Sequence, residues 1–181
     1  MSIYTKKGDK GKTSLLDGVR VAKTELVFEV LGSFDQANAG VGLIRSFLDP
    51  KEPKLAEELE EIQKTFFGLG ARLAADQQSP ADADQYLEKR AGEFEGLIDD
   101  WEQQLPPLRN FILPGGPPAA SAMHLTRTFV RAAERQYHRL PAETKIEAVS
   151  RYLNRLSDLF FQMARFYNHQ HQQKETIWKE R

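Results

Sequence analysis

Apolar residues recur every three or four positions along most of the chain beyond residue 23. In an α-helix this interval places side chains on one face, so each such run predicts a helix with one buried side. Five runs follow one another and predict helices over residues 26–48, 55–73, 87–105, 123–140 and 146–167. The sequence shows no internal repeat and no alternating pattern long enough to predict a β-strand.

The breaks between these runs are rich in proline, glycine and small polar residues. Pro50 and Pro53 follow the first run, the segment 77–80 reads QQSP, and Pro141 ends the fourth run. The segment FILPGGPPAAS, residues 111–121, is predicted to be a loop because its prolines and glycines cannot continue a helix. Five amphipathic helices with short connections pack most simply as one antiparallel-rich bundle, so we predict an all-α fold.

Composition and charge narrow the classes of function. The chain has 181 residues, no cysteine and a formal net charge of −1. This charge gives no overall positive field for nucleic acid, and the lack of cysteine removes disulfides and thiolate metal sites. No apolar run approaches the roughly 18 residues that a membrane span requires. We therefore predict a soluble, cytoplasmic protein that binds neither nucleic acid nor membranes.

Polar residues form a second stripe beside the apolar one on three of the predicted helices. One explanation is a solvated face with intrahelical ion pairs. Arginine, asparagine and histidine are less typical of such a face than lysine and glutamate, and Gly40 and Gly42 each cost a helix about 1 kcal/mol relative to alanine. Close packing against another group explains these residues better. The stripes contain Asp35, Asn38 and Gly42, then His124, Arg127, Arg131, Glu134 and Arg135, and finally Asn154 and Asp158.

The chain begins with TKKGDKGKTS at residues 5–14, which combines lysines, glycines and hydroxyl residues. It is not a Walker A loop, because Lys6 stands where that motif has its first glycine. Gly8 and Gly11 can still leave backbone N–H groups open to an anion, with positive charge from the neighbouring lysines. Considered alone, the segment is better explained as a flexible basic N-terminus.

The four histidines do not predict a metal centre. His124, His138, His169 and His171 lack the spacing of an HExxH zinc site. A satisfied or solvated histidine explains each of them better.

Three separated blocks of the sequence carry a resemblance to a known family. They are IYTKKGDKGKTSLLDGVRVAK (3–23), FILPGGPPAASAMHLTRTFVRAAER (111–135) and YLNRLSDLFFQMAR (152–165). A weaker fourth block, LGSFDQAN (31–38), is similar to a family pattern of Gly, two residues, then Asp-Glu-Leu-Asn. In this order the blocks resemble the PduO-type ATP:cob(I)alamin adenosyltransferases, the corrinoid adenosyltransferase family, which makes adenosylcobalamin from ATP and reduced corrinoid.

The resemblance implies one cobalamin adenosyltransferase domain over residues 1–181. It would consist of a glycine- and lysine-rich ATP loop at 1–23, a ferritin-like five-helix bundle at 24–170 and a mobile C-terminal tail at 171–181. The resemblance also implies a homotrimer with its active sites between subunits. Asp35 of one subunit would form an ion pair with Arg127 of its neighbour, which is better interpreted as fixing the shape of the site than as a source of stability.

The resemblance further assigns the site residues. Asp35, Arg127 and Phe111 would act in catalysis, and Phe111 would face the corrin of cob(I)alamin and exclude the lower axial ligand of cobalt. Mg²⁺ would be held by the ATP phosphates, with Glu134 as a further ligand. The residues that would bind ATP are Thr5, Lys6, Gly8, Asp9, Lys10, Gly11, Lys12, Thr13, Lys23, Arg131, Glu134, Arg135 and Asn154.

The reaction of this family fits the residue types in the stripes. Cobalt(I) is itself the nucleophile that attacks C5′ of the ribose of ATP, so no catalytic acid or base is needed. The protein has to align the reactants and neutralise the departing triphosphate, a role suited to lysines, arginines, open amides and Mg²⁺. An apolar wall such as Phe111 denies cobalt an axial ligand and so raises its reduction potential.

Three positions depart from the family pattern. Gln36 and Ala37 stand where Glu and Leu are usual, and Ala132 stands where a second arginine follows Arg131. These departures leave an alternative, a catalytically weakened paralogue that binds ATP or corrinoid as a carrier or chaperone. A corrinoid reductase and an adenosylcobalamin-dependent enzyme are the expected partners. The polar tail around Trp178 is expected either to fray or to fold over the nucleotide.

Overall fold

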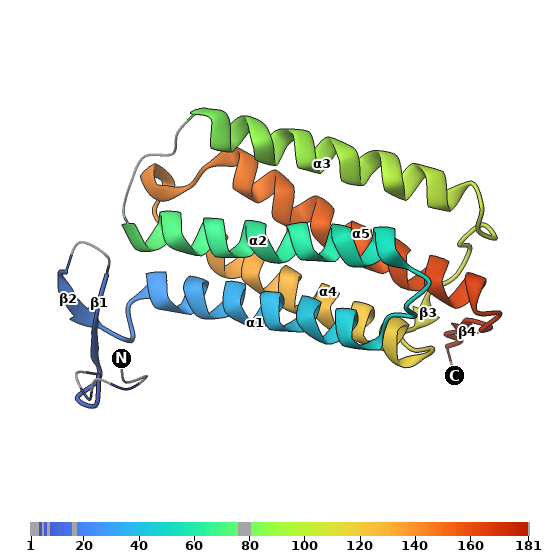
Figure 1. The fold of residues 1–181 in the computed structure, drawn as a ribbon, viewed down its shortest axis with the longest axis horizontal. Helices are drawn as coiled ribbons and strands as arrows, with labels where there is room; N and C mark the ends of the chain where they lie inside the picture. The colour runs from blue at the N-terminus through green and yellow to red at the C-terminus, as the bar shows by residue number, and fades with distance from the viewer. Residues whose placement is uncertain (1–3, 5, 7, 16–17, 76–80, 181) are drawn as a thin grey trace.

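The computed structural model describes residues 4, 6, 8–15, 18–75 and 81–180. These residues form five α-helices, which confirms the predicted all-α bundle (Figure 1). The helices are α1 Leu26–Phe47, α2 Pro53–Ala75, α3 Ala81–Glu102, α4 Pro118–His138 and α5 Glu147–Gln170, with a 3-10 turn at Ala142–Thr144. None of the helices in this part of the chain combines the length and the apolar character that crossing a bilayer requires.

The helices run side by side along the long axis of the molecule (Figure 1). α1 packs against α2 and α4, and α5 packs against α3 and α4. The apolar stripes meet in one core, to which α5 contributes several large, fully buried side chains, among them Tyr152, Leu153, Leu156, Leu159 and Phe160. Burying a side chain of this size stabilises the fold by roughly 1.5–3 kcal/mol, so the predicted stripes account for the arrangement of the helices.

Gly40 and Gly42 of α1 are explained by close packing between helices of the same chain. A Cβ added at Gly40 would lie only 2.7 Å from Thr126 Oγ1 on α4. A Cβ at Gly42 would lie 3.3 Å from Gln63 Nε2 on α2. Asn38 is likewise buried, so the stripe on α1 faces its own bundle at these positions and only Asp35 is exposed.

Gly40→Ala is expected to destabilise the protein by about 1–3 kcal/mol, although alanine is the better helix former. The added methyl group would overlap the Thr126 hydroxyl and press on the Phe129 ring, 3.2 Å away, and so force α1 and α4 apart. Urea unfolding followed by circular dichroism measures the change. Gly96→Ala on α3 is the matched control, because a Cβ there meets no atom within 4 Å. Equal stability of the two variants would contradict the packing explanation.

The start of α4 corrects the predicted loop at residues 111–121. The helix begins at Pro118 rather than near residue 123, with Pro117 as its N-cap residue. Proline is well tolerated in the first helical turn, because the N–H that it lacks has no partner there. The proline-rich end of the segment therefore begins the helix, and only the part before it connects α3 to α4.

Short strands that the hydrophobic pattern does not predict lie at both ends of the bundle (Figure 1). β1 Lys12–Ser14 pairs antiparallel with β2 Arg20–Ala22, next to the start of α1. β3 Ile112–Leu113 pairs antiparallel with β4 Thr176–Ile177 at the opposite end. Strands of two or three residues are too short to show an alternating pattern. The second pair joins the C-terminal tail to the connection between α3 and α4.

Candidate active site

The segment predicted to bind phosphate folds as a turn that leads into the β1–β2 hairpin. The N–H of Gly11 donates to Gly8 O at 3.3 Å, and the N–H of Lys23 donates to Gly11 O at 2.9 Å. Gly11 has φ +73°, a conformation that favours glycine. The Lys23 ammonium lies over Gly8, since a Cβ on Gly8 would be 3.1 Å from Lys23 Nζ. The structure thus brings Gly8, Gly11 and Lys23 together, and Lys12 and Thr13 follow in β1.

The remaining residues of this segment extend the charged surface. Lys6, Asp9 and Lys10 are exposed, and Lys6 adopts a positive φ of 59°. Thr5 lies outside the described residues. The hairpin stands clear of the helices at the start of α1 (Figure 1), so its lysines are open to an anion on another surface.

Glu134 and Asn154 meet between α4 and α5, as expected of residues in one pocket. Asn154 Nδ2 donates to Glu134 Oε1 at 3.0 Å. Asn154 Oδ1 in turn accepts from Arg155 Nη1 at 2.8 Å, and Arg155 Nε pairs with Glu95 Oε1 on α3 at 2.7 Å. This chain of contacts fixes the orientation of the Asn154 amide, and within the part of the chain that the structure describes Glu134 Oε2 accepts no hydrogen bond.

Three arginines on α4 differ from most arginines of the bundle. Six others are ion-paired: Arg45, Arg72, Arg90, Arg151, Arg155 and Arg165. Arg127, Arg131 and Arg135 form no ion pair with any residue that the structure describes. Arg135 Nη1 only donates to the backbone oxygen of Arg131 at 3.0 Å. A row of like charges without internal partners is suited to an anionic ligand.

Arg127 occupies the most enclosed place in this row. Its guanidinium lies 5.8 Å from the centre of the Phe161 ring, and its Nε is buried without a hydrogen-bond partner in the described chain. Burial, together with the charge of Arg131, lowers the pKa of the Arg127 guanidinium. Asp35 is exposed on α1 and forms no ion pair with Arg127 of its own chain. The predicted pair between neighbouring subunits stays a prediction.

Phe111 lies at the far end of the bundle beside the C-terminal tail. Its ring is 80% exposed and meets the edge of the Trp178 ring, with 6.4 Å between ring centres. Leu113 and Ile177 are also exposed there, so the β3–β4 pair presents an apolar surface. The tail is therefore folded against the loop that carries Phe111. The sequence analysis expected the tail either to fray or to fold over the nucleotide, and it did not predict this contact.

The hairpin and Phe111 do not meet within one chain. The hairpin adjoins the start of α1, whereas Phe111 adjoins β4 at the opposite end of the bundle (Figure 1). A helix of 22 residues such as α1 is about 33 Å long, which exceeds the reach of a nucleotide. One chain alone therefore cannot place the hairpin and Phe111 around the same ligand.

His124 is a residue of the α4 stripe whose surroundings the sequence did not reveal. It is 3% exposed, stands edge-on to Phe161 and has no hydrogen-bond partner at either ring nitrogen among the described residues. Burial, with a smaller contribution from the Arg127 charge, lowers the pKa of His124 from 6.5 to about 4. Phe161 thus contacts both His124 and Arg127. The only sign of this contact in the sequence is that Phe161 directly follows Phe160, a residue of the apolar stripe of α5.

His124 is expected to make folding stability fall as the pH drops from 7 to 5. Its pKa is lower in the folded chain than in the unfolded chain, so the unfolded chain binds more protons in this range. The expected loss from this residue is about 2 kcal/mol. Urea unfolding of wild type and His124→Met at both pH values measures it, with the exposed His138→Met as control. A His124→Met protein with the pH dependence of wild type would contradict the assignment.

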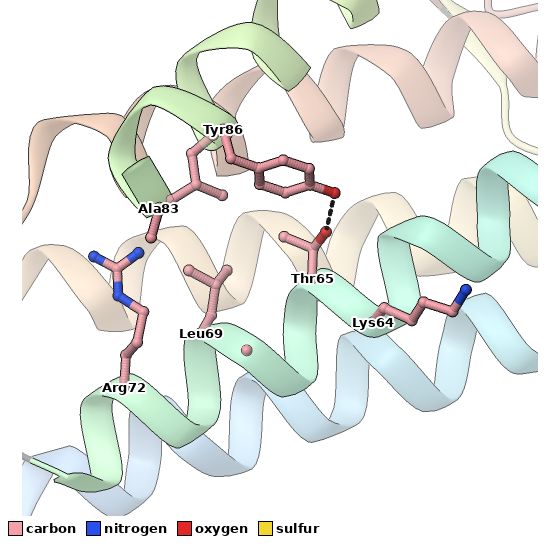
Figure 2. A pocket seen from close by; sticks show the side chains of 8 residues that line it. Lys64, Thr65, Leu69, Arg72, Ala83 and Tyr86 are labelled. Carbon is pink, nitrogen blue, oxygen red and sulfur yellow. Dashed lines mark hydrogen bonds between the residues drawn. The ribbon is translucent and has the colours of Figure 1, made fainter. Parts of the chain in front are cut away.

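A cavity of about 240 Å³ lies between α2 and α3, away from the residues considered above (Figure 2). Tyr86 and Thr65 meet across it, with their hydroxyl oxygens 3.2 Å apart, while Lys64 and Arg72 flank it. Arg72 is already paired with Asp84 at 2.8 Å. The lining is mainly apolar and includes none of the predicted site residues, so this cavity is not the candidate active site.

The described residues include no cluster of three or more His, Cys, Asp or Glu side chains that could hold a metal ion. Mg²⁺ commonly needs only one or two protein carboxylates when it is held by phosphates. Glu134, with one carboxylate oxygen bonded to Asn154, fits that limited role. The residues present are therefore compatible with Mg²⁺ delivered on ATP, and they do not form a separate metal centre.

Comparison with known proteins gives matches along nearly the whole chain. Residues 3–167 match the family model described as cobalamin adenosyltransferase. The corrinoid adenosyltransferase PduO of Citrobacter freundii is 39% identical over 181 residues, which cover 99% of this chain and 53% of that protein. Human corrinoid adenosyltransferase MMAB is 40% identical, with 91% of this chain and 68% of that protein covered. The chain thus spans about half the length of the Citrobacter protein.

Solved structures share the fold. A variant of the PduO-type ATP:corrinoid adenosyltransferase from Lactobacillus reuteri, complexed with cobalamin and ATP, matches with a TM-score of 0.87. It is 37% identical, and the match covers 99% of this chain and 100% of that one. A different variant of the same enzyme, complexed with ATP, gives a TM-score of 0.84 at 38% identity over 98% of this chain.

Proposed function

The chain belongs to the cobalamin adenosyltransferase family, and we propose that it transfers the 5′-deoxyadenosyl group of ATP to the cobalt of cob(I)alamin. The products are adenosylcobalamin and triphosphate. The observation that carries the proposal is the row of Arg127, Arg131 and Arg135 on α4, which has no internal ion pairs among the described residues. Cations placed ahead of time where negative charge develops are what a departing triphosphate requires.

The proposed reaction balances without a protein acid or base. The cobalt(I) electron pair forms a bond to C5′ of the ribose, and the bond from C5′ to the triphosphate oxygen breaks with its electrons. Cobalt is formally oxidised to cobalt(III), and no proton moves. Residues of this chain therefore have to align the two substrates and neutralise the leaving group. The lysines of the hairpin and the arginines of α4 are the groups available for that role.

We place the site between subunits of a homotrimer. Support comes from the separation of the hairpin and Phe111 within one chain and from the lack of an ion-pair partner for Arg127 among the described residues of its own chain. The ATP phosphates would lie between the hairpin of one subunit and a group of residues on the neighbouring subunit, namely Arg131, Glu134, Arg135 and Asn154. Asp35 of one subunit would pair with Arg127 of the next, which would satisfy the partly buried guanidinium.

Mg²⁺ would enter this site on the ATP phosphates, with Glu134, a carboxylate on the same helix as the arginine row, as a further ligand. Bound there, the ion would offset the negative charge of the triphosphate. Asn154 would hold the Glu134 carboxylate in place through its 3.0 Å hydrogen bond.

The apolar surface around Phe111 would receive the corrin ring. An apolar side chain at the lower face of cobalt supplies no ligand atom, and this favours reduction of cobalt(II) to cobalt(I). A corrinoid reductase would supply the electron, and an adenosylcobalamin-dependent enzyme would consume the product.

An anaerobic assay tests the proposal. Cob(I)alamin generated chemically is mixed with ATP, Mg²⁺ and the protein, and loss of the cobalt(I) absorbance is followed alongside triphosphate release. Saturation with both substrates and one triphosphate per adenosylcobalamin are expected, and light scattering should give the mass of three chains. Binding of ATP without adenosylcobalamin formation would overturn the transferase proposal in favour of a carrier.

A further inference from the structure

Burial in the core does not fix the position of the Phe111 ring. The ring is 80% exposed, and its ring neighbour among the described residues is Trp178 of the C-terminal tail. The backbone N–H of Trp178 also donates to Phe111 O at 2.8 Å. We call residues 103–117 the Phe111 loop and residues 171–180 the tail. The place of the ring therefore depends on what holds this loop and the tail together.

Arg165 on α5 joins the tail to the beginning of the Phe111 loop. It is 3% exposed, although charged side chains are almost never fully buried unless they are paired. Its Nε pairs with Glu175 Oε1 of the tail at 3.2 Å, and its Nη2 donates to Pro106 O of the loop at 3.0 Å. One buried guanidinium thus holds together Pro106 and Glu175, which are almost 70 residues apart in the sequence.

Asn168, one turn further along α5, joins the tail to the other end of the loop. It is 2% exposed, its Nδ2 donates to Gly115 O at 3.0 Å, and its backbone oxygen accepts from Gln173 N–H at 2.8 Å. Gly116 has φ +133°, and a Cβ there would lie 2.0 Å from Asn168 Oδ1. The loop can approach α5 this closely only because residue 116 is glycine.

We propose that Arg165 and Asn168 are positioning residues for Phe111. They fix both ends of the Phe111 loop and the start of the tail to α5, and the β3–β4 pair then sets the ring between these anchors. Neither side chain needs to touch a substrate. This inference rests on the proposed function for its chemical consequence. The attachment of the Phe111 loop and the tail to α5 through Arg165 and Asn168, which we call the tether, is a property of the chain alone.

The consequence for the reaction depends on which oxidation state of cobalt is supplied. A misplaced Phe111 ring would allow a ligand to reach the lower face of cobalt(II) and so hinder its reduction. Cobalt(I) carries no such ligand, so transfer from cob(I)alamin would depend far less on the ring. Removal of a side chain that orients a metal-site residue without touching the metal typically lowers activity about 10- to 100-fold.

Glu175→Gln is the decisive variant, because it removes the partner of Arg165 at the surface of the bundle and leaves the core intact. Glu58→Gln is a matched control, since Glu58 is also a partly buried carboxylate paired with an arginine that is mostly shielded from solvent, Arg90 on α3. Asn168→Ala breaks the second anchor independently. Each is made in a Trp101→Phe background, in which Trp178 is the only remaining tryptophan and reports the tail by its fluorescence.

The tether predicts that Trp178 gains mobility and iodide accessibility in Glu175→Gln and Asn168→Ala, but not in Glu58→Gln. Turnover from cob(II)alamin with a chemical reductant should fall at least about tenfold in the first two variants, with less than about a threefold change from cob(I)alamin. Unchanged Trp178 fluorescence would overturn the tether. A released Trp178 with unchanged turnover from cob(II)alamin, or an equal loss from both cobalt states, would overturn the positioning role.

The proposed function fails in a different way. If the wild-type protein in the Trp101→Phe background turns over neither cobalt state, the transferase proposal and the consequence for cobalt both fall. The fluorescence comparison then still decides whether Arg165 and Asn168 hold the tail, because it needs no substrate.

Discussion

Arg127→Ala is expected to lower kcat/KM for ATP and cob(I)alamin at least about a hundredfold. The guanidinium is partly buried, is oriented against Phe161 and has no ion pair within the described chain, so its charge is available to the site. Ala132 supplies no second cation after Arg131 to replace it. Anaerobic loss of the cobalt(I) absorbance measures the effect. Arg72→Ala is the control, since Arg72 is also partly buried but pairs with Asp84 on α3.

A complementation experiment then separates an intersubunit site from a site within one chain. Asp35→Ala and Arg127→Ala chains, each of which is expected to be inactive by itself, are unfolded and refolded together in equal amounts. In a ring of subunits, about one site in four would combine an intact Asp35 from one chain with an intact Arg127 from its neighbour. Recovery to about a quarter of wild-type activity is expected. A mixture that stays inactive would contradict the proposed pair between subunits.

The hydrophobic period was sufficient to predict the five helices, because each helix buries one apolar face in the common core. Residues such as Leu153, Leu156 and Phe160 are buried on one face of α5, and burial of that face is what orders the bundle. The start of α4 was placed too late, because Pro118 and the alanines after it carry no strong apolar period. The β3–β4 pair was missed, since its strands are short and its two halves are more than 60 residues apart.

The candidate site was predictable only as separate pieces. The resemblance to the family drew attention to Glu134 and Asn154, and the structure brings them together at 3.0 Å. The sequence did not show which residues of the α1 stripe are buried: Asn38 faces the interior of its own bundle, whereas Asp35 is exposed. Arg165 was hidden inside an apolar run and its partner Glu175 inside a polar tail. A period in the sequence shows which face is buried, but it does not show which distant segment covers that face.

Phe111→Ala is expected to lower turnover from cob(II)alamin with a chemical reductant about a hundredfold, and turnover from cob(I)alamin much less. The ring is the most exposed large apolar side chain among the described residues, and it contributes little to the core. Its removal should therefore leave the fold intact while it opens the lower face of cobalt to a ligand. Electron paramagnetic resonance of bound cob(II)alamin in the presence of ATP shows directly whether an axial ligand has returned.

The identity of the substituent separates an apolar wall from mere bulk at this position. Phe111→Leu keeps an apolar group and should retain most of the turnover from cob(II)alamin, whereas Phe111→His offers cobalt an imidazole ligand and should be worse than alanine. Leu108→Ala is the control, because Leu108 is an exposed apolar residue of the same loop outside the β3–β4 pair. Equal losses in the leucine and histidine variants would show that ring shape matters, and the ligand-exclusion role of Phe111 would be wrong. If Leu108→Ala lowered turnover from cob(II)alamin as much as Phe111→Ala, the loss would reflect a change in the whole loop and not the removal of the Phe111 ring.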